Sequence, residues 1–120
     1  MKPFFLESFR GDSLPIGLTV TVAGAVVDLT HAQLFFTLKQ SASDPDSAAL
    51  VKKDSNTGGI TITDAPNGVA LVNLIPDDTA TLPLEQPLVA DVQLIDGNGN
   101  LFTVASGTLV VHQDITLRTS

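Results

Sequence analysis

The feature that most constrains the fold of this chain is a strict two-residue alternation near its start. Apolar side chains occupy every second position of this stretch, at Leu14, Ile16, Leu18, Val20 and Val22. Successive side chains of a β-strand point to opposite faces of its sheet. The pattern therefore predicts a strand over residues 14–22 whose even-numbered side chains face a core.

The same period of two returns along the chain and predicts an all-β protein. Further strands are expected over residues 34–39, 49–53, 60–63, 69–74, 88–94 and 101–111. Asn67-Gly68 is a strong hairpin signal, and the Asp-Gly-Asn-Gly-Asn segment at 96–100 predicts a second hairpin. About seven or eight short strands, with turn signals roughly every ten residues, are typical of an antiparallel β-sandwich.

Two local features refine this prediction. The segment Pro76-Leu82 suits at most one short helical turn, because proline fits the first helical position and acidic side chains favour a helix N-terminus. Glycine in a strand pattern often marks a bulge, so Ser106-Gly107 is expected to shift the core face to Leu109 and Val111. The predicted core comprises Leu18, Val20, Leu34, Phe36, Val72, Val92, Leu94 and Leu109.

Length and charge bound what such a sandwich can do. The 120 residues suit one domain, in which residues 1–8 form an N-terminal arm or edge strand and residues 9–120 form the sandwich. The formal net charge of −7 argues against nucleic acid as a partner, because phosphate contacts need clustered Lys and Arg. The longest uncharged run, residues 13–27, contains proline and glycine and favours a strand, so we expect no membrane insertion.

Residues able to carry catalysis are sparse. The chain has no cysteine, which excludes thiolate ligands and thiol nucleophiles. His31 and His112 are the only histidines, and Glu7 and Glu85 are the only glutamates. None of them stands in a motif of a hydrolase or a metalloenzyme. We expect no catalytic residue, no cofactor and no small-molecule substrate, so the chain is predicted not to be an enzyme.

Two short motifs are explained by turn chemistry. Asp96, Asn98 and Asn100 match the first three ligands of a calcium loop. The match then fails, because Leu101 and Gly107 stand where the loop requires glycine and glutamate. We expect a tight turn there and no metal. The segment Arg10-Gly11-Asp12 spells a tripeptide that cell-adhesion receptors bind, but glycine and aspartate between two strands also make an ordinary turn.

The aromatic residues favour a docking role. The chain has six Phe but no Trp and no Tyr, which argues against the aromatic platforms of sugar-binding or single-strand nucleic-acid-binding domains. An apolar N-terminus and a tail of alternating polarity are suited to strand addition on a neighbouring subunit. The predicted interface residues are Phe4, Phe5, Leu6, Phe9, Phe35, Ile115 and Leu117.

The order of the chain's motifs resembles the N-terminal immunoglobulin-like modules of tailed-bacteriophage virion proteins, of the baseplate and tail-fibre type. The matching pieces lie at residues 10–13, 18–20, 27–30, 59–62, 68–70, 75–82, 91–94 and 107–116. The resemblance implies an immunoglobulin-like β-sandwich over residues 9–120. It also implies a non-enzymatic structural subunit of the virion, assembled in the host cytoplasm, that docks to other virion proteins and to copies of itself.

One departure from that family bears on the position in the particle. Baseplate and fibre proteins continue beyond this module into a stalk or receptor-binding part, whereas this sequence stops at Ser120. We therefore expect a tail, baseplate, adaptor or decoration component. The alternative is a bacterial surface or carbohydrate-binding β-sandwich module, which predicts an export signal or exposed aromatic side chains.

Overall fold

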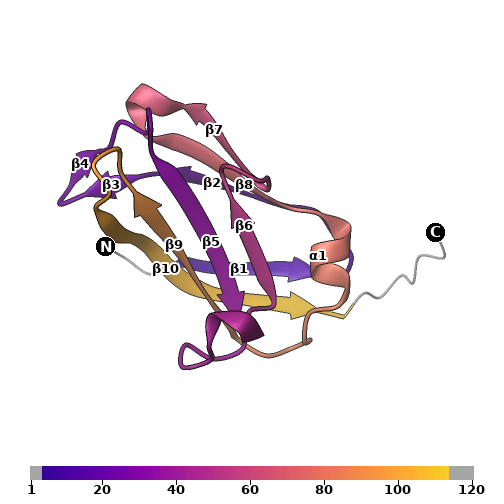
Figure 1. Ribbon diagram of the computed structural model, residues 1–120. Coiled ribbons are helices and arrows are strands. Elements are labelled where there is room, and N and C mark those ends of the chain that lie inside the picture. The colour runs from indigo at the N-terminus through magenta and orange to yellow at the C-terminus, as the bar shows by residue number, and fades with distance from the viewer. Residues whose placement is uncertain (1–3, 114–120) are drawn as a thin grey trace.

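The alternating segments of the chain form the strands of a two-layer β-sandwich, and the computed structural model describes residues 4–113 (Figure 1). The strands are β1 (Phe4–Phe9), β2 (Leu14–Thr19), β3 (Thr21–Val22), β4 (Ala25–Val26), β5 (Gln33–Lys39), β6 (Val51–Asp54), β7 (Ile60–Asp64), β8 (Val69–Leu74), β9 (Leu88–Ile95) and β10 (Leu101–His112). One short helix, α1 (Pro76–Ala80), follows β8, and 3₁₀ turns cover Asp46–Ala48 and Ala65–Asn67.

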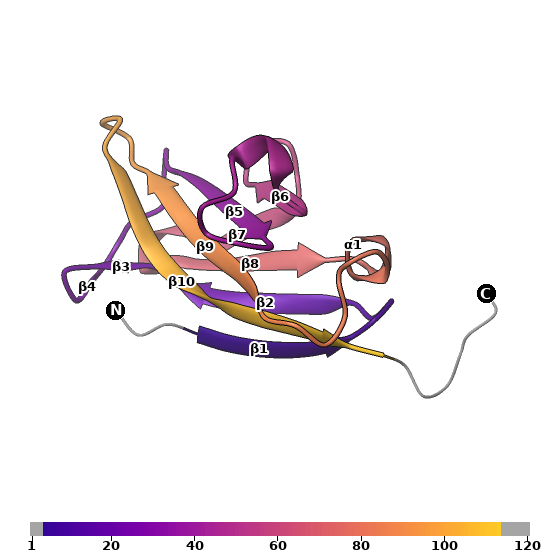
Figure 2. The same ribbon diagram turned by 90° about the horizontal axis from the view of Figure 1, so that it is seen from below.

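Among the described residues, eight strands make up the two layers, in agreement with the prediction. One sheet has the order β1-β10-β9-β5-β6, and the other has the order β2-β8-β7. Figure 2 shows the layers in profile, with β1 at the margin of the molecule alongside β10. This order matches immunoglobulin domains, in which strands B, E and D face a sheet built on strands C, F and G. Within the two layers one strand pair departs from the antiparallel rule, because β1 runs parallel to β10.

The core lies between the layers. The residues predicted to form it are buried, except for Leu18. Phe36 of β5 is the largest fully buried side chain and occupies the strand on which antibody domains carry their core Trp. Val20, Leu34, Val72, Val92, Leu94 and Leu109 are also buried. Leu18 is not: it is half-buried and packs against the core, whereas Ile16 of the same strand is buried.

The predicted strand over residues 14–22 is wrong in its length. The strand β2 ends at Thr19, and the chain then turns away into the small β3–β4 hairpin. Ala23 and Gly24 form the tip of this hairpin, both with positive φ, at 53° and 82°. Two successive positive φ values define the tight turn that matches the twist of a hairpin. Val20 joins the two elements by donating to the Gly68 carbonyl and accepting from the Val27 N–H.

The bulge in β10 lies at a different residue from the one predicted. The pairing of β10 with β9 slips by one residue at Val104, between Thr103 and Ala105, whereas Ser106 and Gly107 lie in regular pairing. The predicted outcome still holds, because Leu109 and Val111 face the core. The predicted hairpins β7–β8 and β9–β10 and the short helical turn are all present.

Candidate functional site

Strand β1 carries four of the seven predicted interface residues and divides them between two faces. Phe4 and Leu6 are half-buried and pack against the core. Phe5 and Phe9 point the other way and keep 62% and 48% of their surface exposed. Residues 4–9 are thus an edge strand of the chain's own sheet, and this strand extends past the expected boundary at residue 8. Its outward aromatic side chains are its most accessible apolar groups.

Gly107 explains how β1 approaches β10 so closely. Phe4 pairs with Gly107 in the parallel register. A Cβ atom at position 107 would overlap both the Phe4 carbonyl oxygen and the Phe4 ring. Glycine in a strand often marks such a close approach of backbone. The sequence predicted a bulge at this glycine, whereas the tertiary structure shows a close contact with Phe4.

A three-residue polar cluster holds the far end of β1. His112, near the end of β10, has its Nδ1 2.8 Å from Oε1 of Glu85 and its Nε2 3.2 Å from Oε1 of Glu7. The Phe9 ring lies 5.7 Å from the imidazole, centroid to centroid. Glu85 also accepts from the Gln113 N–H at 2.9 Å. The two glutamates of the chain therefore converge on one histidine, although Glu7 is 105 residues away from it.

The carboxylates change the protonation of this cluster. Hydrogen bonding to Glu85 and then to Glu7 raises the pKa of His112 above its ordinary value. Hydrogen bonds from the Gln113 N–H and from His112 lower the pKa of Glu85. Both shifts favour an imidazolium between two carboxylates, in which each ring nitrogen donates to an oxygen. This arrangement can clamp β1 and the loop that carries Glu85 to the end of β10.

The Arg10-Gly11-Asp12 segment forms the turn that connects β1 to β2. The Asp12 N–H donates to the Phe9 carbonyl at 3.0 Å, and Gly11 has a φ of 81°. The buried hydroxyl of Thr79, in α1, donates to the Asp12 carbonyl at 2.9 Å. All three residues of the turn are half-buried. The structure places this tripeptide at the joint between the two sheets.

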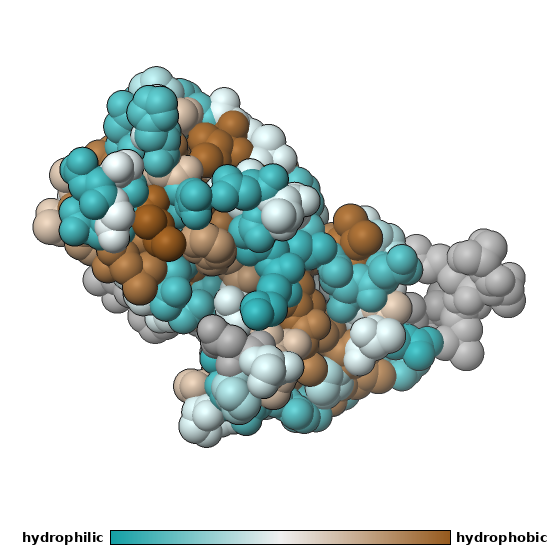
Figure 3. Space-filling view, in the orientation of Figure 1, coloured by the Kyte–Doolittle hydropathy of each residue, from teal (hydrophilic) through white to brown (hydrophobic). Residues whose placement is uncertain are grey.

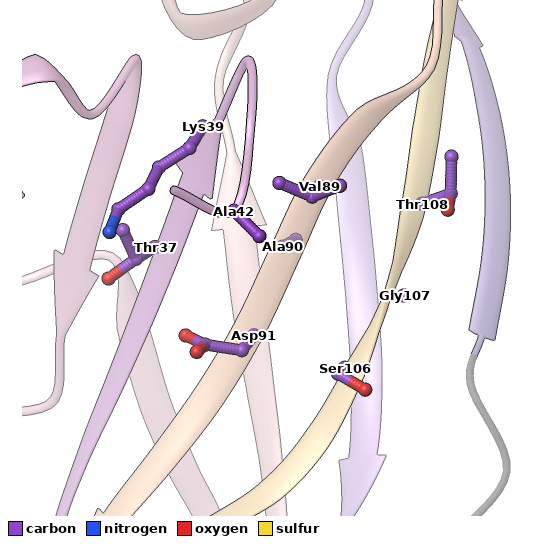
Figure 4. A pocket seen from close by; sticks show the side chains of 9 residues that line it. All are labelled: Thr37, Lys39, Ala42, Val89, Ala90, Asp91, Ser106, Gly107 and Thr108. Carbon is purple, nitrogen blue, oxygen red and sulfur yellow. The ribbon is translucent and has the colours of Figure 1, made fainter. Parts of the chain in front are cut away.

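A groove of about 350 Å³ lies on the outer face of the five-stranded sheet (Figure 4). Small side chains of β5, β9 and β10 line most of it, among them Thr37, Ser106 and Thr108. Lys39 and Asp91 supply its charges, and the Lys39 ammonium donates to the Asp44 carbonyl at 2.9 Å. The lining contains no histidine and therefore no Ser-His pair of the hydrolase type. Thr108 pairs with Phe5, so the groove begins beside β1.

The calcium-like segment forms a closed turn. Asp96 accepts from the backbone N–H groups of Asn98 and Asn100, each at 2.9 Å, and from the Asn100 side chain at 3.2 Å. These hydrogen bonds, chiefly the one from the Asn100 backbone, lower the pKa of Asp96. The carboxylate is thus engaged within its own loop. Within residues 4–113, no group of three or more His, Asp or Glu side chains is arranged to hold a metal ion.

The other predicted interface residues lie away from β1. Phe35 is half-buried on the outer face of β5, opposite Asp54 of β6. Ile115 and Leu117 fall outside the described residues. Sequence reasoning missed Val26 and Leu101, which are strongly exposed in the β3–β4 and β9–β10 hairpins. On the face of the molecule seen in Figure 3, apolar surface is interrupted by polar side chains and does not form one continuous patch.

Comparison with known proteins defines the fold class. No family model matches the chain, and no curated protein sequence matches it. Its structure is similar to that of the NK cell receptor Nkp44, a triggering partner in natural cytotoxicity, with a TM-score of 0.56 and 19% sequence identity over 92% of this chain and 99% of that one. The chain is therefore an immunoglobulin-like β-sandwich, in agreement with the prediction. No helix in the described part of the chain is long and apolar enough to cross a membrane.

Proposed function

We propose that this chain is a non-enzymatic structural subunit of a bacteriophage virion, a tail, baseplate, adaptor or decoration component, that acts by protein–protein docking. The observation that carries the docking role is strand β1. It is anchored to the sheet on one side only and displays Phe5 and Phe9 at the surface. Exposed aromatic side chains on a fixed scaffold are the groups that anchor protein interfaces.

The assignment to a virion rests on the resemblance in motif order over nearly the whole chain. The net charge of −7 favours proteins over nucleic acid as partners. These protein partners include copies of the same chain. The clamp of His112 with Glu7 and Glu85 supports a docking role in a further way. It fixes β1 before a partner arrives, which reduces the entropy lost on binding.

The test is the protein content of purified particles. Tailed particles from cells that carry the gene should contain the chain at a fixed copy number, measured by quantitative mass spectrometry after density-gradient purification. A Phe5→Thr, Phe9→Thr double variant should lower this copy number, whereas Leu101→Thr, which removes an exposed apolar side chain elsewhere, should leave it unchanged. Particles free of the chain would refute the virion assignment.

A second function is favoured by the same exposed rings. A carbohydrate-binding module needs aromatic side chains at the surface, and Phe5 and Phe9 meet that condition although the chain has no Trp or Tyr. Retardation in gels that contain soluble polysaccharide distinguishes this function from docking. A sugar-binding module would be retarded and would lose the retardation in the Phe5→Thr, Phe9→Thr variant, whereas a protein-docking subunit would migrate normally.

A further inference from the structure

The two sheets have four edge strands among the described residues, and three of these edges carry features that discourage pairing with another strand. The edges are β1 and β6 in one sheet and β2 and β7 in the other. Unpaired backbone groups on an edge are a template for pairing with a foreign strand. Natural sheets block such edges with short strands, lysines, prolines or bulges.

In β2 the blocking residue is proline. Val20, just after β2, donates to the Gly68 carbonyl of the β8 side, so even-numbered residues direct their backbone groups toward β8. The backbone groups of Pro15, Gly17 and Thr19 therefore point to the open edge. Proline has no N–H to offer there. The β2 edge thus lacks a donor near its start.

The edge strands β6 and β7 are shorter than β1, and β7 is also irregular. Strand β6 has four residues and includes Lys52 and Lys53. The Lys53 ammonium is 2.8 Å from the Asp78 carboxylate of α1, so its side chain reaches across to the other layer. Strand β7 has five residues, and its pairing with β8 shifts in register between Ile62 and Asp64.

Strand β1 carries none of these features over Phe4–Phe9. It has six residues in continuous register with β10, and it contains no proline, lysine or glycine. Arg10 donates its N–H to the His112 carbonyl at 2.9 Å, which places the even-numbered backbone groups on the β10 side. The N–H groups of Phe5, Glu7 and Phe9 consequently point to the open edge. The side chains of the same three residues lie on the outer face of the sheet.

We propose that the open edge of β1 binds an extended segment of a different protein by strand addition, with a basic residue opposite Glu7 and apolar residues opposite Phe5 and Phe9. Backbone hydrogen bonds would supply affinity, and alternate side chains would supply specificity. The charge of the site favours a basic partner, because the Glu7 side chain remains 59% exposed and the chain has a net charge of −7. Facing residues on neighbouring strands attract when their charges are opposite.

A second copy of this chain fits the same edge less well. Antiparallel pairing of two β1 strands over residues 5–9 would place Phe5 opposite Phe9 of the other copy, which is favourable. It would also place Glu7 opposite the second Glu7, and like charges directly opposite are destabilising. Two molecules with a net charge of −7 also repel each other as they approach. The structure therefore favours a basic segment from another protein.

The experiment uses the full chain and a synthetic peptide with blocked ends and the sequence Thr-Val-Thr-Lys-Thr-Val-Thr. Amide hydrogen exchange is followed by NMR with and without saturating peptide. Strand addition predicts that exchange slows about tenfold or more at Phe5, Glu7 and Phe9 and stays unchanged at Leu6 and Ser8, which already face β10. Slowed exchange at the β9–β10 hairpin alone, or at no position, would overturn the proposal.

A charge swap tests the partner's chemistry. The Glu7→Lys variant should bind the lysine peptide about tenfold more weakly and prefer a peptide with glutamate at the same position. Glu7→Gln, which removes only the charge, should bind both peptides alike. Leu101→Thr, altered at an equally exposed apolar site outside β1, should bind like wild type. Equal binding of both peptides by the wild-type chain would contradict a basic partner.

This inference rests on the proposed docking function, and the two can fail separately. A chain that binds the peptide through β1 but is missing from particles would keep the edge site and refute the virion assignment. A chain present in particles whose β1 amides gain no protection with the peptide would refute the edge site alone. A third outcome is that the chain forms concentration-dependent dimers in sedimentation and that the Phe5, Glu7 and Phe9 amides are protected without peptide. This outcome would overturn the proposal of a foreign segment, because the edge would then bind a second copy of the chain.

Discussion

Strands β9 and β1 belong to the same sheet, yet they contribute to the fold in different ways. Every second residue of β9 is buried, from Leu88 to Leu94, because the strand has neighbours on both sides and a layer below it. In β1 only Ser8 is buried, and its apolar inward residues Phe4 and Leu6 are half-covered. Alternation in the sequence thus specifies a strand and its faces, whereas the packing of each strand in the fold decides how much of its apolar surface is removed from water.

At β1, where the apolar side chains are only partly buried, backbone and polar contacts hold the strand in place. The strand is fixed by backbone pairing to β10, by the close approach at Gly107 and by the contact of Glu7 with His112. These contacts hold the strand in place and leave its outer edge open. The contrast with β9 separates residues that stabilise the sandwich from residues that are available for a partner.

The largest expected effect comes from the centre of the sheet. Leu94→Ala should lower the free energy of unfolding by about 2–5 kcal/mol, because a fully buried leucine loses its transfer energy and leaves a cavity. Leu6→Ala in β1 should cost clearly less, because Leu6 is half-buried. Urea denaturation of both variants measures the difference. Equal losses would mean that β1 is as much a part of the core as β9.

The next effect concerns the attachment of β1 to β10. Gly107→Ala should destabilise the protein by about 1–3 kcal/mol, because the added methyl group collides with Phe4 and forces the backbone apart. Gly17→Ala is the matched control, since a Cβ atom at Gly17 of β2 meets no atom within 4 Å. Thermal unfolding should show a loss for the first variant only. A neutral Gly107→Ala would show that β1 is not tightly seated.

A smaller effect is expected from the pH dependence of the clamp. The pKa of His112 is raised in the folded state, so its contribution to stability is present below the pKa of the unfolded chain and is lost as pH rises through the folded value. The pKa of Glu85 is lowered, so its contribution is lost as pH falls through the folded value. The contribution of the clamp to stability should therefore be complete between the ordinary pKa of Glu85 and the ordinary pKa of His112, and it should be lost beyond their shifted values.

NMR titration of the imidazole checks this expectation directly. In Glu85→Gln the pKa of His112 should fall toward its ordinary value, because the first partner loses its charge. Glu7→Gln should lower it less. An identical titration curve in wild type and in both variants would show that the three side chains do not interact in solution.

The smallest effect is predicted on the outer face of β1. Phe5→Thr should change the free energy of unfolding by no more than about 0.5 kcal/mol, because the ring is largely exposed and the backbone pairing is kept. Chemical denaturation provides the measurement. A loss comparable to that of Leu94→Ala would mean that Phe5 serves the fold and is not available to a partner.

The strands and their inward faces followed from the sequence because they depend on local patterns. Residues 34–39 and 88–94 show the period of two, and the structure buries Leu34, Phe36, Val92 and Leu94 as predicted. Turn chemistry placed the β7–β8 and β9–β10 hairpins, since Gly68 and Gly99 adopt the positive φ values that tight turns require. These features depend on neighbours in the chain, so a single sequence is enough to predict them.

The candidate site could be predicted only in part. The apolar N-terminus pointed to Phe4, Phe5, Leu6 and Phe9 together, but the sequence could not tell which of them face the core and which remain exposed. The bulge at Val104 and the function of Gly107 depend on which strand lies alongside.

By itself, the sequence determined that this chain forms an all-β sandwich, where most of its strands and turns fall, and which side chains face inward. Only the tertiary structure decided that β1 lies parallel to β10 and that Glu7, Glu85 and His112 meet. The physical reason is the distance along the chain: strand and turn patterns are local, whereas edge position and a contact across 105 residues arise only when the sheets pack.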